Sequence, residues 1–229
     1  KEVKKNYIFF AIDGNKISGT KFISEAIRKG ANIIISKKSA KYKSSKIPII
    51  LVKDSREALA EACSKFYKQK PSNIIAVTGT NGKSSVADFF YQLLNLNKIP
   101  VASIGTLGVK YKNYRKKTSL TSIDCLSLHK NLQNIKKNKV DNVILEASSH
   151  GLKQKRLNSL DIKIGIFTNL SHDHLDYHKN MKDYLESKMY LFKNLLNNKS
   201  KIITDAENKE FKLIKSISKN KKIKKITIG

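Results

Sequence analysis

The sequence has 229 residues, enough for one large domain or two modest ones, and an apolar fraction of 40%, which is ordinary for a globular protein. No run approaches the roughly 20 consecutive apolar residues of a membrane span, and the N-terminus shows no signal-peptide pattern. We therefore expect a cytoplasmic protein without a membrane partner. Its two cysteines, Cys63 and Cys125, are expected to be buried thiols, as in a reducing compartment.

The net charge of +28 would favour a nucleic acid or another anionic partner, but only four of the basic residues are arginine. Proteins that bind nucleic acids typically use Arg for bidentate contacts and interleave aromatic side chains for stacking. Here the lysines are spread along the whole chain among many Asn and Ile residues, as an AT-rich coding bias would produce on a solvated surface. We predict no nucleic-acid partner, and a basic nucleic-acid-binding module stays open as an alternative.

Apolar runs bounded by turn residues alternate with amphipathic stretches, which is typical of a parallel α/β protein. Strands are predicted at residues 7–11, 31–36, 49–52, 74–78, 101–104, 142–147, 164–168, 201–204 and 225–228. Helices are predicted at residues 21–29, 55–68, 83–96, 123–137, 181–196 and 207–218. Asp54 followed by Glu57 indicates a capping box at the start of the second helix.

The stretch Gln69-Lys70-Pro71-Ser72 indicates a boundary between a small α/β domain, residues 1–70, and a larger one, residues 71–229. The first strand begins only a few residues into the chain, and nothing follows the last predicted strand. We therefore expect the start of the first domain and the end of the second to be incomplete.

The nonapeptide VTGTNGKSS, residues 77–85, is a glycine-rich turn between a predicted strand and a predicted helix. A strict Walker A motif would have Gly at position 77, where this chain has Val77. The shorter form still allows backbone N–H groups to bind phosphate oxygens at a helix N-terminus, with Lys83 on the β/γ-phosphates and Ser84 on Mg²⁺. The predicted polyphosphate-binding residues are Gly79, Thr80, Asn81, Gly82, Lys83, Ser84 and Ser85; the alternative is an ordinary glycine-rich turn.

The segment NVILEASSHGL, residues 142–152, is an apolar strand that ends in Glu146 and continues into polar residues. Doubly wound sheets bind ligands at the carboxyl ends of their parallel strands, so this carboxylate would lie near the glycine-rich turn and could hold Mg²⁺. A surface acid at a strand end is the alternative, and this segment alone does not separate the two.

The segment FTNLSHDHLDYH, residues 167–178, contains three histidines and two aspartates within seven residues, which suggests a metal. A metallo-hydrolase would show His-x-His-x-Asp-His, but Tyr177 separates Asp176 from His178. A polar loop without a ligand is a further alternative. Since the segment follows another apolar strand, we favour one histidine near a magnesium-nucleotide.

The strings VTGTNGKSS, LEASSHGLKQKRL and FTNLSHDHLDYHKNMKDYLESKMYLF, in this order, resemble the Mur ligases, most closely the tripeptide-synthetase branch (MurE type). The likeness extends from about Tyr7 to Gly229. It implies a small N-terminal UDP-substrate-binding domain and a P-loop, mostly parallel, doubly wound ATP-binding central domain that is truncated here. A C-terminal amino-acid-binding domain would be absent, so this chain alone is not expected to turn over. Folylpolyglutamate synthases share the phosphate loop but not the later strings, and remain an alternative.

The resemblance implies an ATP-dependent amide ligase of peptidoglycan precursor synthesis, and hence a role in cell-wall formation and cell division. It would add meso-diaminopimelate or L-lysine to UDP-N-acetylmuramoyl-L-alanyl-D-glutamate through an acyl phosphate, as a monomer. The catalytic residues implied are Lys83, Glu146, His174 and Lys188. The ligands implied for two Mg²⁺ ions are Ser84, Glu146, His174 and Lys188, the last as a carbamate formed with CO₂. Two cations would allow the two reacting anions to approach each other.

For the acceptor, the resemblance implies contacts from Thr121, Ser122, Ser148, Gln154 and Arg156; loop polarity is the alternative for each. The match is looser at Ile123, where the family pattern has proline, and at Ser18, where it has Asp before Gly19. Arg156 is notable because arginine is scarce in this chain, and its fork of donors suits carboxylates or a pyrophosphate.

Overall fold

The computed structural model describes residues 3–14, 17–37, 47–118, 120–174 and 176–229. It divides into two compact units, Lys1–Ala62 and Cys63–Gly229, and the division falls inside helix α2 (Ser55–Phe66). The assignment of residues 1–70 and 71–229 to separate functional domains stays a prediction. The carboxylate of Asp54 accepts from the amides of Arg56 and Glu57 at 2.8 and 3.2 Å, which confirms that Asp54 caps α2.

The first unit contains a three-stranded parallel sheet in the order β1-β2-β3, formed by Ile8–Phe10, Ile33–Lys37 and Ile49–Val52. A 3₁₀ turn (Gly19–Phe22) leads into α1 (Ile23–Arg28). Its core is small, and consists of Ala11, Ile23, Ala26, Ala31 and Ile34.

Asp13 organises the loop after β1 in this unit. The hydroxyl of Ser18 donates to Asp13 Oδ1 at 2.5 Å, and Lys37 forms an ion pair with Oδ2 at 2.9 Å. Both contacts hold the pKa of Asp13 below its ordinary value, the Ser18 hydrogen bond first. Ser18 also accepts from the amide of Thr20 at 3.3 Å and thereby caps the 3₁₀ turn. The residue that departs from the family pattern therefore has a structural role here.

The second unit is built on an eight-stranded sheet in the order β11-β10-β9-β4-β8-β5-β6-β7. In chain order its strands are β4 (Asn73–Thr78), β5 (Val101–Gly105), β6 (Gly108–Tyr111), β7 (Tyr114–Lys116), β8 (Asn142–Glu146), β9 (Ile162–Phe167), β10 (Lys201–Asp205) and β11 (Lys224–Ile228). The pairs from β11 to β5 are parallel, while β6 and β7 add an antiparallel edge. The prediction of a mostly parallel sheet is confirmed.

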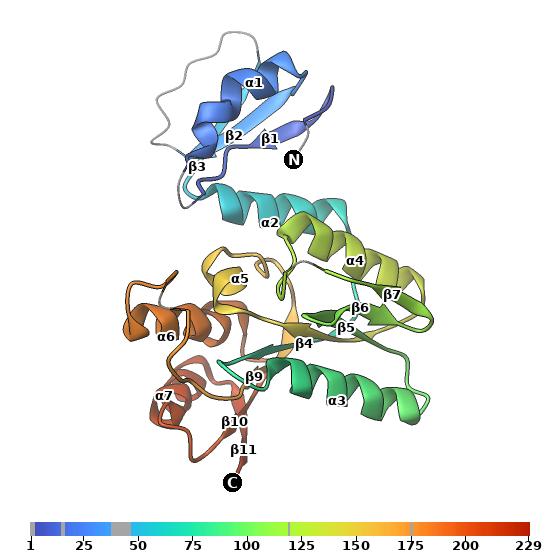
Figure 1. Ribbon diagram of the computed structural model, residues 1–229, viewed down its shortest axis with the longest axis vertical. Coiled ribbons are helices and arrows are strands. Elements are labelled where there is room, and N and C mark those ends of the chain that lie inside the picture. The colour runs from blue at the N-terminus through green and yellow to red at the C-terminus, as the bar shows by residue number, and fades with distance from the viewer. Residues whose placement is uncertain (1–2, 15–16, 38–46, 119, 175) are drawn as a thin grey trace. The chain divides into compact units, whose positions relative to one another are not determined.

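Helices cover both faces of this sheet: in Figure 1, α3 lies against one face and α4 against the other. The helices are α3 (Lys83–Leu96), α4 (Cys125–Lys137), α5 (Ser149–Lys153), α6 (Met181–Tyr190) with a π-helical turn (Leu191–Leu195), and α7 (Phe211–Lys221). Along β4, Ile74 and Ala76 join the core that contains α4, whereas Ile75 and Val77 pack with residues of α3. This two-residue alternation is what a strand buried on both faces requires.

Several predicted boundaries were wrong for local reasons. The helix predicted from residue 123 begins at Cys125, because the side chain of Asp124 caps it by accepting from the Ser127 amide at 3.1 Å. The helix predicted from residue 207 begins at Phe211, since Asp205 Oδ1 accepts from the Glu207 amide at 2.8 Å and holds a turn there. The helix predicted to reach residue 196 changes to π-helical geometry after Tyr190.

Three elements were missed: β6, β7 and α5. The hairpin strands are short and carry lysine and arginine, and α5 has only five residues, so neither produces a clear hydrophobic period. Both predicted buried cysteines are buried.

His129 on α4 is fully buried, and its ring nitrogens have no partner in hydrogen-bonding geometry within the described residues. Burial, followed by the positive charge of Lys70, lowers the pKa of His129 from 6.5 to about 4, and the backbone of Asn158 only partly offsets this. The ring is therefore neutral in the folded protein at neutral pH.

This histidine should make stability depend on pH. Between pH 6.5 and 4 the unfolded chain binds a proton that the native ring excludes, so the free energy of unfolding falls as the pH drops. From the shift to about 4, we expect His129 to contribute about 2–3 kcal/mol of stability loss between pH 7 and 4.5. Urea unfolding of His129→Leu should lack this component; an unchanged pH dependence would contradict the prediction.

Candidate functional site

Three parallel strands, β9, β4 and β8, lie next to one another in the centre of the larger sheet. Their carboxyl ends at Phe167, Thr78 and Glu146 therefore meet at one edge. The predicted phosphate loop, the SSHGL segment and the DHLDYH segment follow these three ends. The topology thus brings the three motifs together, at the edge where doubly wound sheets bind ligands.

The glycines of the phosphate loop have conformations that side chains disfavour. Gly79 has φ of 151°, and a Cβ atom there would lie 1.8 Å from Thr168 Oγ1. Gly82 has φ of 82° and is the N-cap of α3, but a Cβ atom would come no closer than 3.8 Å to Thr168. Glycine is therefore required at position 79 by the positive φ angle and by the close approach of the loop after β9. At position 82 it is required by the positive φ angle alone.

The loop after β9 holds the phosphate loop in place. The amides of Thr80 and Asn81 donate to the carbonyl and side-chain oxygens of Asn169 at 2.9 and 3.0 Å. The Thr168 hydroxyl donates to the Asn81 carbonyl at 2.6 Å, and the Ser171 amide donates to the Thr80 hydroxyl at 2.9 Å. The sequence analysis missed Thr168, Asn169 and Ser171, although their position directly after an apolar strand could have indicated them.

Two lysines share one carbonyl of the phosphate loop. Lys83 donates to the carbonyls of Gly79 at 3.0 Å and Thr80 at 2.7 Å, and Lys188 of α6 donates to the same Gly79 carbonyl at 2.6 Å. Lys188 is only 1% exposed, and its Nζ lies 4.2 Å from the centre of the Tyr184 ring. The structure thus places Lys188 against the loop that Lys83 also contacts.

The environment of these amines lowers their pKa values. Burial, followed by the positive charge of Lys83, lowers the pKa of Lys188 from 10.5 to about 7, while Asp173 opposes the shift. Burial also lowers the pKa of Lys83, against the opposing effect of Glu146 and Asp173. A large share of Lys188 is therefore a neutral amine near pH 7, the form that reacts as a nucleophile.

Glu146 is buried, with 3% exposure, and its carboxylate accepts hydrogen bonds from the start of α3 and from the residue that follows β5. The Ser84 hydroxyl donates to Oε2 at 2.8 Å, and the Thr106 amide and hydroxyl donate to Oε1 and Oε2 at 2.8 and 3.1 Å. A Cβ atom on Gly105 would lie 2.1 Å from Oε1, so any larger residue there would displace the Glu146 side chain. The surface-acid alternative is thereby excluded for Glu146.

His174, the next predicted residue, is exposed and lies near the ring of Tyr184. Its side chain is 43% exposed, and its Nε2 lies 3.4 Å from Asp173 Oδ2. Its ring centre is 6.1 Å from that of Tyr184, the ring over which Lys188 lies. His174 has φ of 53° and its amide donates to Asp173 Oδ1 at 2.8 Å.

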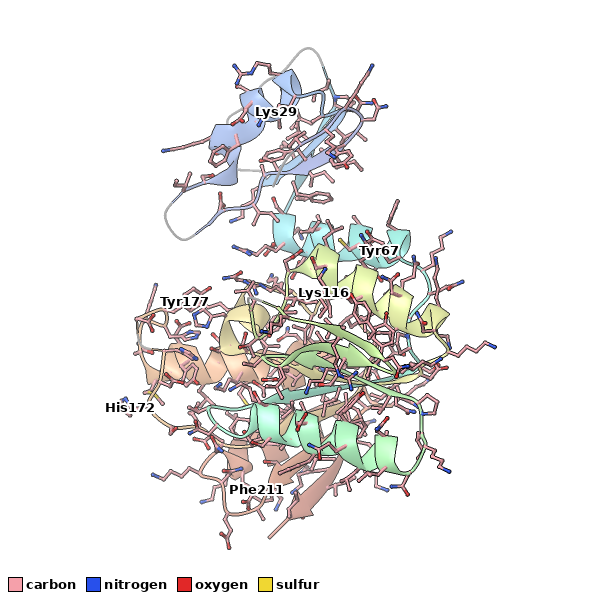
Figure 2. All side chains as sticks on the ribbon, turned by 45° about the vertical axis from the view of Figure 1, so that its right-hand side comes forward. Lys29, Tyr67, Lys116, His172, Tyr177 and Phe211 are labelled. Atoms are coloured by element: carbon pink, nitrogen blue, oxygen red, sulfur yellow. The ribbon has the colours of Figure 1, made fainter. Side chains whose placement is uncertain are left out.

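The other histidines of this region join α5 to α6 and to the loop before it. The buried His178 has Nε2 at 2.9 Å from the Ser149 hydroxyl and Nδ1 at 3.5 Å from Asp183 Oδ2. Burial, then the charge of Lys153, lowers the pKa of His178. His150 lies against Tyr177, with ring centres 3.8 Å apart; Tyr177 projects from the loop before α6 (Figure 2).

Within the described residues, no group of three or more His, Cys, Asp and Glu side chains has the arrangement of a metal site. The carboxylate of Glu146 and the hydroxyl of Ser84 nevertheless form an oxygen pair next to the N-terminus of α3. Oxygen ligands of this kind suit a Mg²⁺ ion that also binds a phosphate.

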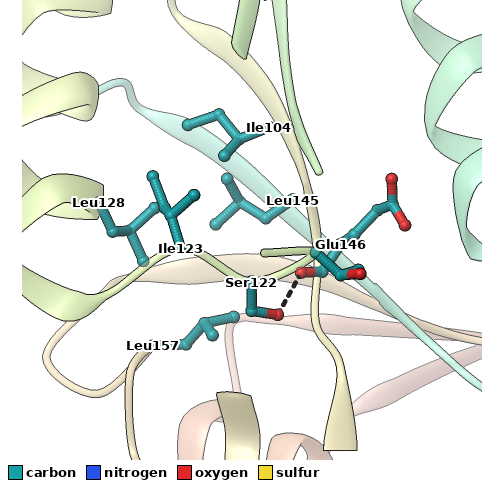
Figure 3. Close-up of a pocket in the computed structure, with 8 residues that line it drawn as sticks. Ile104, Ser122, Ile123, Leu128, Leu145, Glu146 and Leu157 are labelled. Carbon is teal, nitrogen blue, oxygen red and sulfur yellow. Dashed lines mark hydrogen bonds between the residues drawn. The ribbon is translucent and has the colours of Figure 1, made fainter. Parts of the chain in front are cut away.

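The predicted acceptor residues are connected to the backbone of Glu146. The Ser122 hydroxyl donates to the Glu146 carbonyl at 2.8 Å, as the dashed line in Figure 3 marks, and the Ser148 amide donates to the Ser122 hydroxyl at 2.8 Å. A small apolar pocket lies beside Ser122, and the Glu146 carboxylate extends away from its Leu and Ile side chains (Figure 3). Thr121, the residue before Ser122, has its hydroxyl 3.1 Å from the Thr106 hydroxyl.

Arg156 and Gln154 complete this group through side-chain hydrogen bonds. Arg156 donates to Gln154 Oε1 at 2.8 Å and also to the carbonyl of Ser122. Gln154 in turn donates to the Tyr177 hydroxyl at 3.1 Å. Ser148 caps α5 by accepting from the Gly151 amide at 3.1 Å. The five predicted acceptor residues therefore lie in connected segments, next to the strand end that carries Glu146.

A glycine-rich turn between a parallel strand and a helix, with Lys-Ser at the helix start, defines a P-loop α/β protein. Residues 77–229 match the Mur ligase middle domain, and residues 1–67 match the family model described as Mur ligase family, catalytic domain. The chain belongs to the Mur ligase family.

A curated relative and a solved structure with the same name support the assignment to the Mur ligase family. The chain is 41% identical over 233 residues to the UDP-N-acetylmuramoyl-L-alanyl-D-glutamate--2,6-diaminopimelate ligase of Rickettsia montanensis, covering 100% of this chain and 48% of the relative. A solved structure of a ligase with the same name superposes with a TM-score of 0.83 at 30% identity, over 99% of this chain and 46% of that one. The chain thus spans about half the length of the relatives it matches.

A more distant solved structure is a bifunctional folylpolyglutamate synthase/dihydrofolate synthase from Yersinia pestis, with a TM-score of 0.58 at 16% identity. The match covers 74% of this chain and 46% of the synthase chain, and at this identity it shows a shared fold alone. In addition, none of the helices in the described part of the chain has the length and apolar character needed to cross a membrane.

The two loop glycines give a prediction about stability. Gly79→Ala should lower the free energy of unfolding by roughly 2–4 kcal/mol, because it combines an unfavourable φ with a clash against Thr168. Gly82→Ala, which has only the backbone conflict, should cost about 1 kcal/mol. Urea unfolding of the two variants beside the wild type measures the difference, and equal effects would contradict the assignment of the close contact to Gly79.

Proposed function

We propose that the complete protein is an ATP-dependent ligase of peptidoglycan precursor synthesis. It adds the third amino acid to UDP-N-acetylmuramoyl-L-alanyl-D-glutamate, by way of an acyl phosphate. The observation that carries the proposal is the position of Glu146: its carboxylate is hydrogen-bonded to Ser84 of the phosphate loop, and its carbonyl to Ser122 of the predicted acceptor segment. One residue thus joins the proposed sites for the two substrates.

The phosphate loop would bind ATP through residues 79–85. The amides at the start of α3 and the positive end of the helix attract the phosphates, and Lys83 neutralises the β- and γ-phosphates. Lys83 lies on this loop, where its amine donates to the Gly79 and Thr80 carbonyls. Phosphoryl transfer to a carboxylate depends mainly on such charge neutralisation and on alignment.

Ser84, Glu146, His174 and Lys188 are the proposed ligands of Mg²⁺, two ions in all. When bound, Mg²⁺ would neutralise phosphate and carboxylate charge so that the two anions can meet. The hydrogen-bonded pair of Ser84 and Glu146 supports the first of these sites. The proximity of His174 and Lys188 to the ring of Tyr184 supports the second.

Lys188 is proposed to act as a carbamate. Its neutral amine adds CO₂, an N–C bond forms, one proton is released, and the product is an anionic carboxylate-like group. Burial and the adjacent Lys83 favour loss of the ammonium proton, since together they lower the pKa of Lys188 to about 7. The positive charge of Lys83 would then stabilise the anionic product.

Thr121, Ser122, Ser148, Gln154 and Arg156 are proposed to bind the UDP-N-acetylmuramoyl-dipeptide. Arg156 supports this because its guanidinium is already oriented by Gln154 and the Ser122 carbonyl, which leaves less conformational entropy to lose when a carboxylate binds. We propose 2,6-diaminopimelate as the added amino acid, in agreement with the names of the relatives. The proposal also includes a cytoplasmic monomer without a nucleic-acid or membrane partner.

The proposal is tested with the protein expressed from its complete gene. With ATP, Mg²⁺ and UDP-N-acetylmuramoyl-L-alanyl-D-glutamate, we expect phosphate release that depends on diaminopimelate, with L-lysine as the comparison amino acid. Lys83→Ala should lower kcat/KM by roughly 10²–10³-fold, because a charged group facing the transferred phosphoryl group is lost.

A dihydrofolate or folylglutamate acceptor with L-glutamate serves as the control for the folylpolyglutamate alternative. Turnover with that acceptor, and none with the muramoyl-dipeptide, would overturn the proposal.

The carbamate gives a separate prediction. In ¹³C-bicarbonate at pH 8, the protein should show a carbamate carbonyl resonance that is lost in Lys188→Ala. Lys193→Ala is the matched control, because Lys193 lies close by in the chain but is partly exposed and paired with Glu186. Retention of the resonance in Lys188→Ala would place the carbamate on another amine.

A further inference from the structure

Thr106 is the first residue of the tight turn between β5 and β6, where the sheet changes from parallel to antiparallel. Gly105 and Gly108 are paired across this turn, and Gly108 has φ of 94°. The Thr118 hydroxyl also contacts this turn, by donating to the Gly105 carbonyl at 3.0 Å. The hairpin therefore fixes the backbone of Thr106 at the carboxyl edge of the sheet, beside the end of β8.

Thr106 contacts both oxygens of the buried Glu146 carboxylate. Its amide donates to Oε1 at 2.8 Å and its hydroxyl to Oε2 at 3.1 Å, while Ser84 donates to the same Oε2 at 2.8 Å. A carboxylate on a flexible side chain can rotate about its last torsion, and donors to both oxygens oppose that rotation. The orientation of Glu146 thus depends on a residue outside the three motifs.

The same hydroxyl also lies 3.1 Å from the Thr121 hydroxyl. Because a threonine hydroxyl has one proton, it donates either to Glu146 Oε2 or to the Thr121 hydroxyl at any moment. Thr106 is exposed, whereas Glu146 is buried, so this contact lies where the carboxylate meets solvent. The hydroxyl connects the proposed metal ligand with the proposed acceptor segment.

We propose that Thr106 is a positioning residue of the ligase: it orients the Glu146 carboxylate for Mg²⁺ and holds Thr121 beside it. The inference rests on the proposed function, and it adds a residue that acts through Glu146 without itself contacting the reacting atoms. The hydrogen bond from the backbone amide of Thr106 to Oε1 does not involve the side chain. Replacing the hydroxyl alone therefore weakens the orientation of Glu146 and leaves the turn in place.

The test uses the protein expressed from its complete gene, with calorimetric titration of ATP at a series of Mg²⁺ concentrations. Thr106→Val keeps the shape of the side chain and removes its hydroxyl. We expect the Mg²⁺ concentration that half-saturates ATP binding to rise about 3- to 10-fold, the effect of one hydrogen bond to a charged group at a solvent-accessible site. ATP affinity in EDTA should stay within about twofold of the wild type, because the hydrogen-bond partners of Thr106 described here are Glu146 and Thr121 and not the phosphate loop.

Two matched variants separate positioning from simple stability. Thr106→Ser restores the hydroxyl and should return the Mg²⁺ dependence to that of the wild type. Thr118→Val removes a threonine hydroxyl from the same turn without touching Glu146, and should leave the Mg²⁺ dependence unchanged.

An unchanged Mg²⁺ dependence in Thr106→Val overturns the inference, as does an equal shift in Thr118→Val or Thr106→Ser. A wild-type protein that binds no ATP, with or without Mg²⁺, would overturn the proposed function and this inference with it.

Discussion

The buried carboxylate of Glu146 is the point on which the arrangement of the site depends. A charge removed from water is costly unless donors replace the lost hydration, and here those donors come from Ser84 and Thr106. The donors lie beyond the ends of β4 and β5, which are the two neighbours of β8 in the sheet. The hydrogen bonds therefore connect the segments that follow β4 and β5 to the end of β8.

A second constraint is the shared carbonyl of Gly79. Lys83 and Lys188 both donate to it, so two amines lie close together in a poorly solvated place. Burial, and then the positive charge of Lys83, lowers the pKa of Lys188 and disfavours its ammonium form. The proposed polyphosphate would bring negative charge to both amines.

Much of the fold could be predicted because its strands are buried on both faces. Near-continuous apolar runs such as Ile74–Thr78 and Asn142–Glu146 indicate parallel strands, and the glycine-rich turn fixes the start of α3. The hairpin of β6 and β7 could not be predicted in the same way, because its strands have only four and three residues and the outer one, β7, is exposed throughout. The antiparallel edge matters for the site, since its turn positions Thr106.

The sequence by itself determined the glycine-rich turn before α3 and the family, because both depend on residues adjacent in the chain: Gly79 to Ser84, and the strings that begin at Leu145 and Phe167. Only the tertiary structure decided which side chains meet. Thr106 and Asn169 lie far in sequence from the residues they hold, and their contacts arise from the strand order β9-β4-β8-β5, which no local pattern encodes. The low pKa of Lys188 has the same origin, since burial and the nearness of Lys83 exist only after α6 has packed against the phosphate loop.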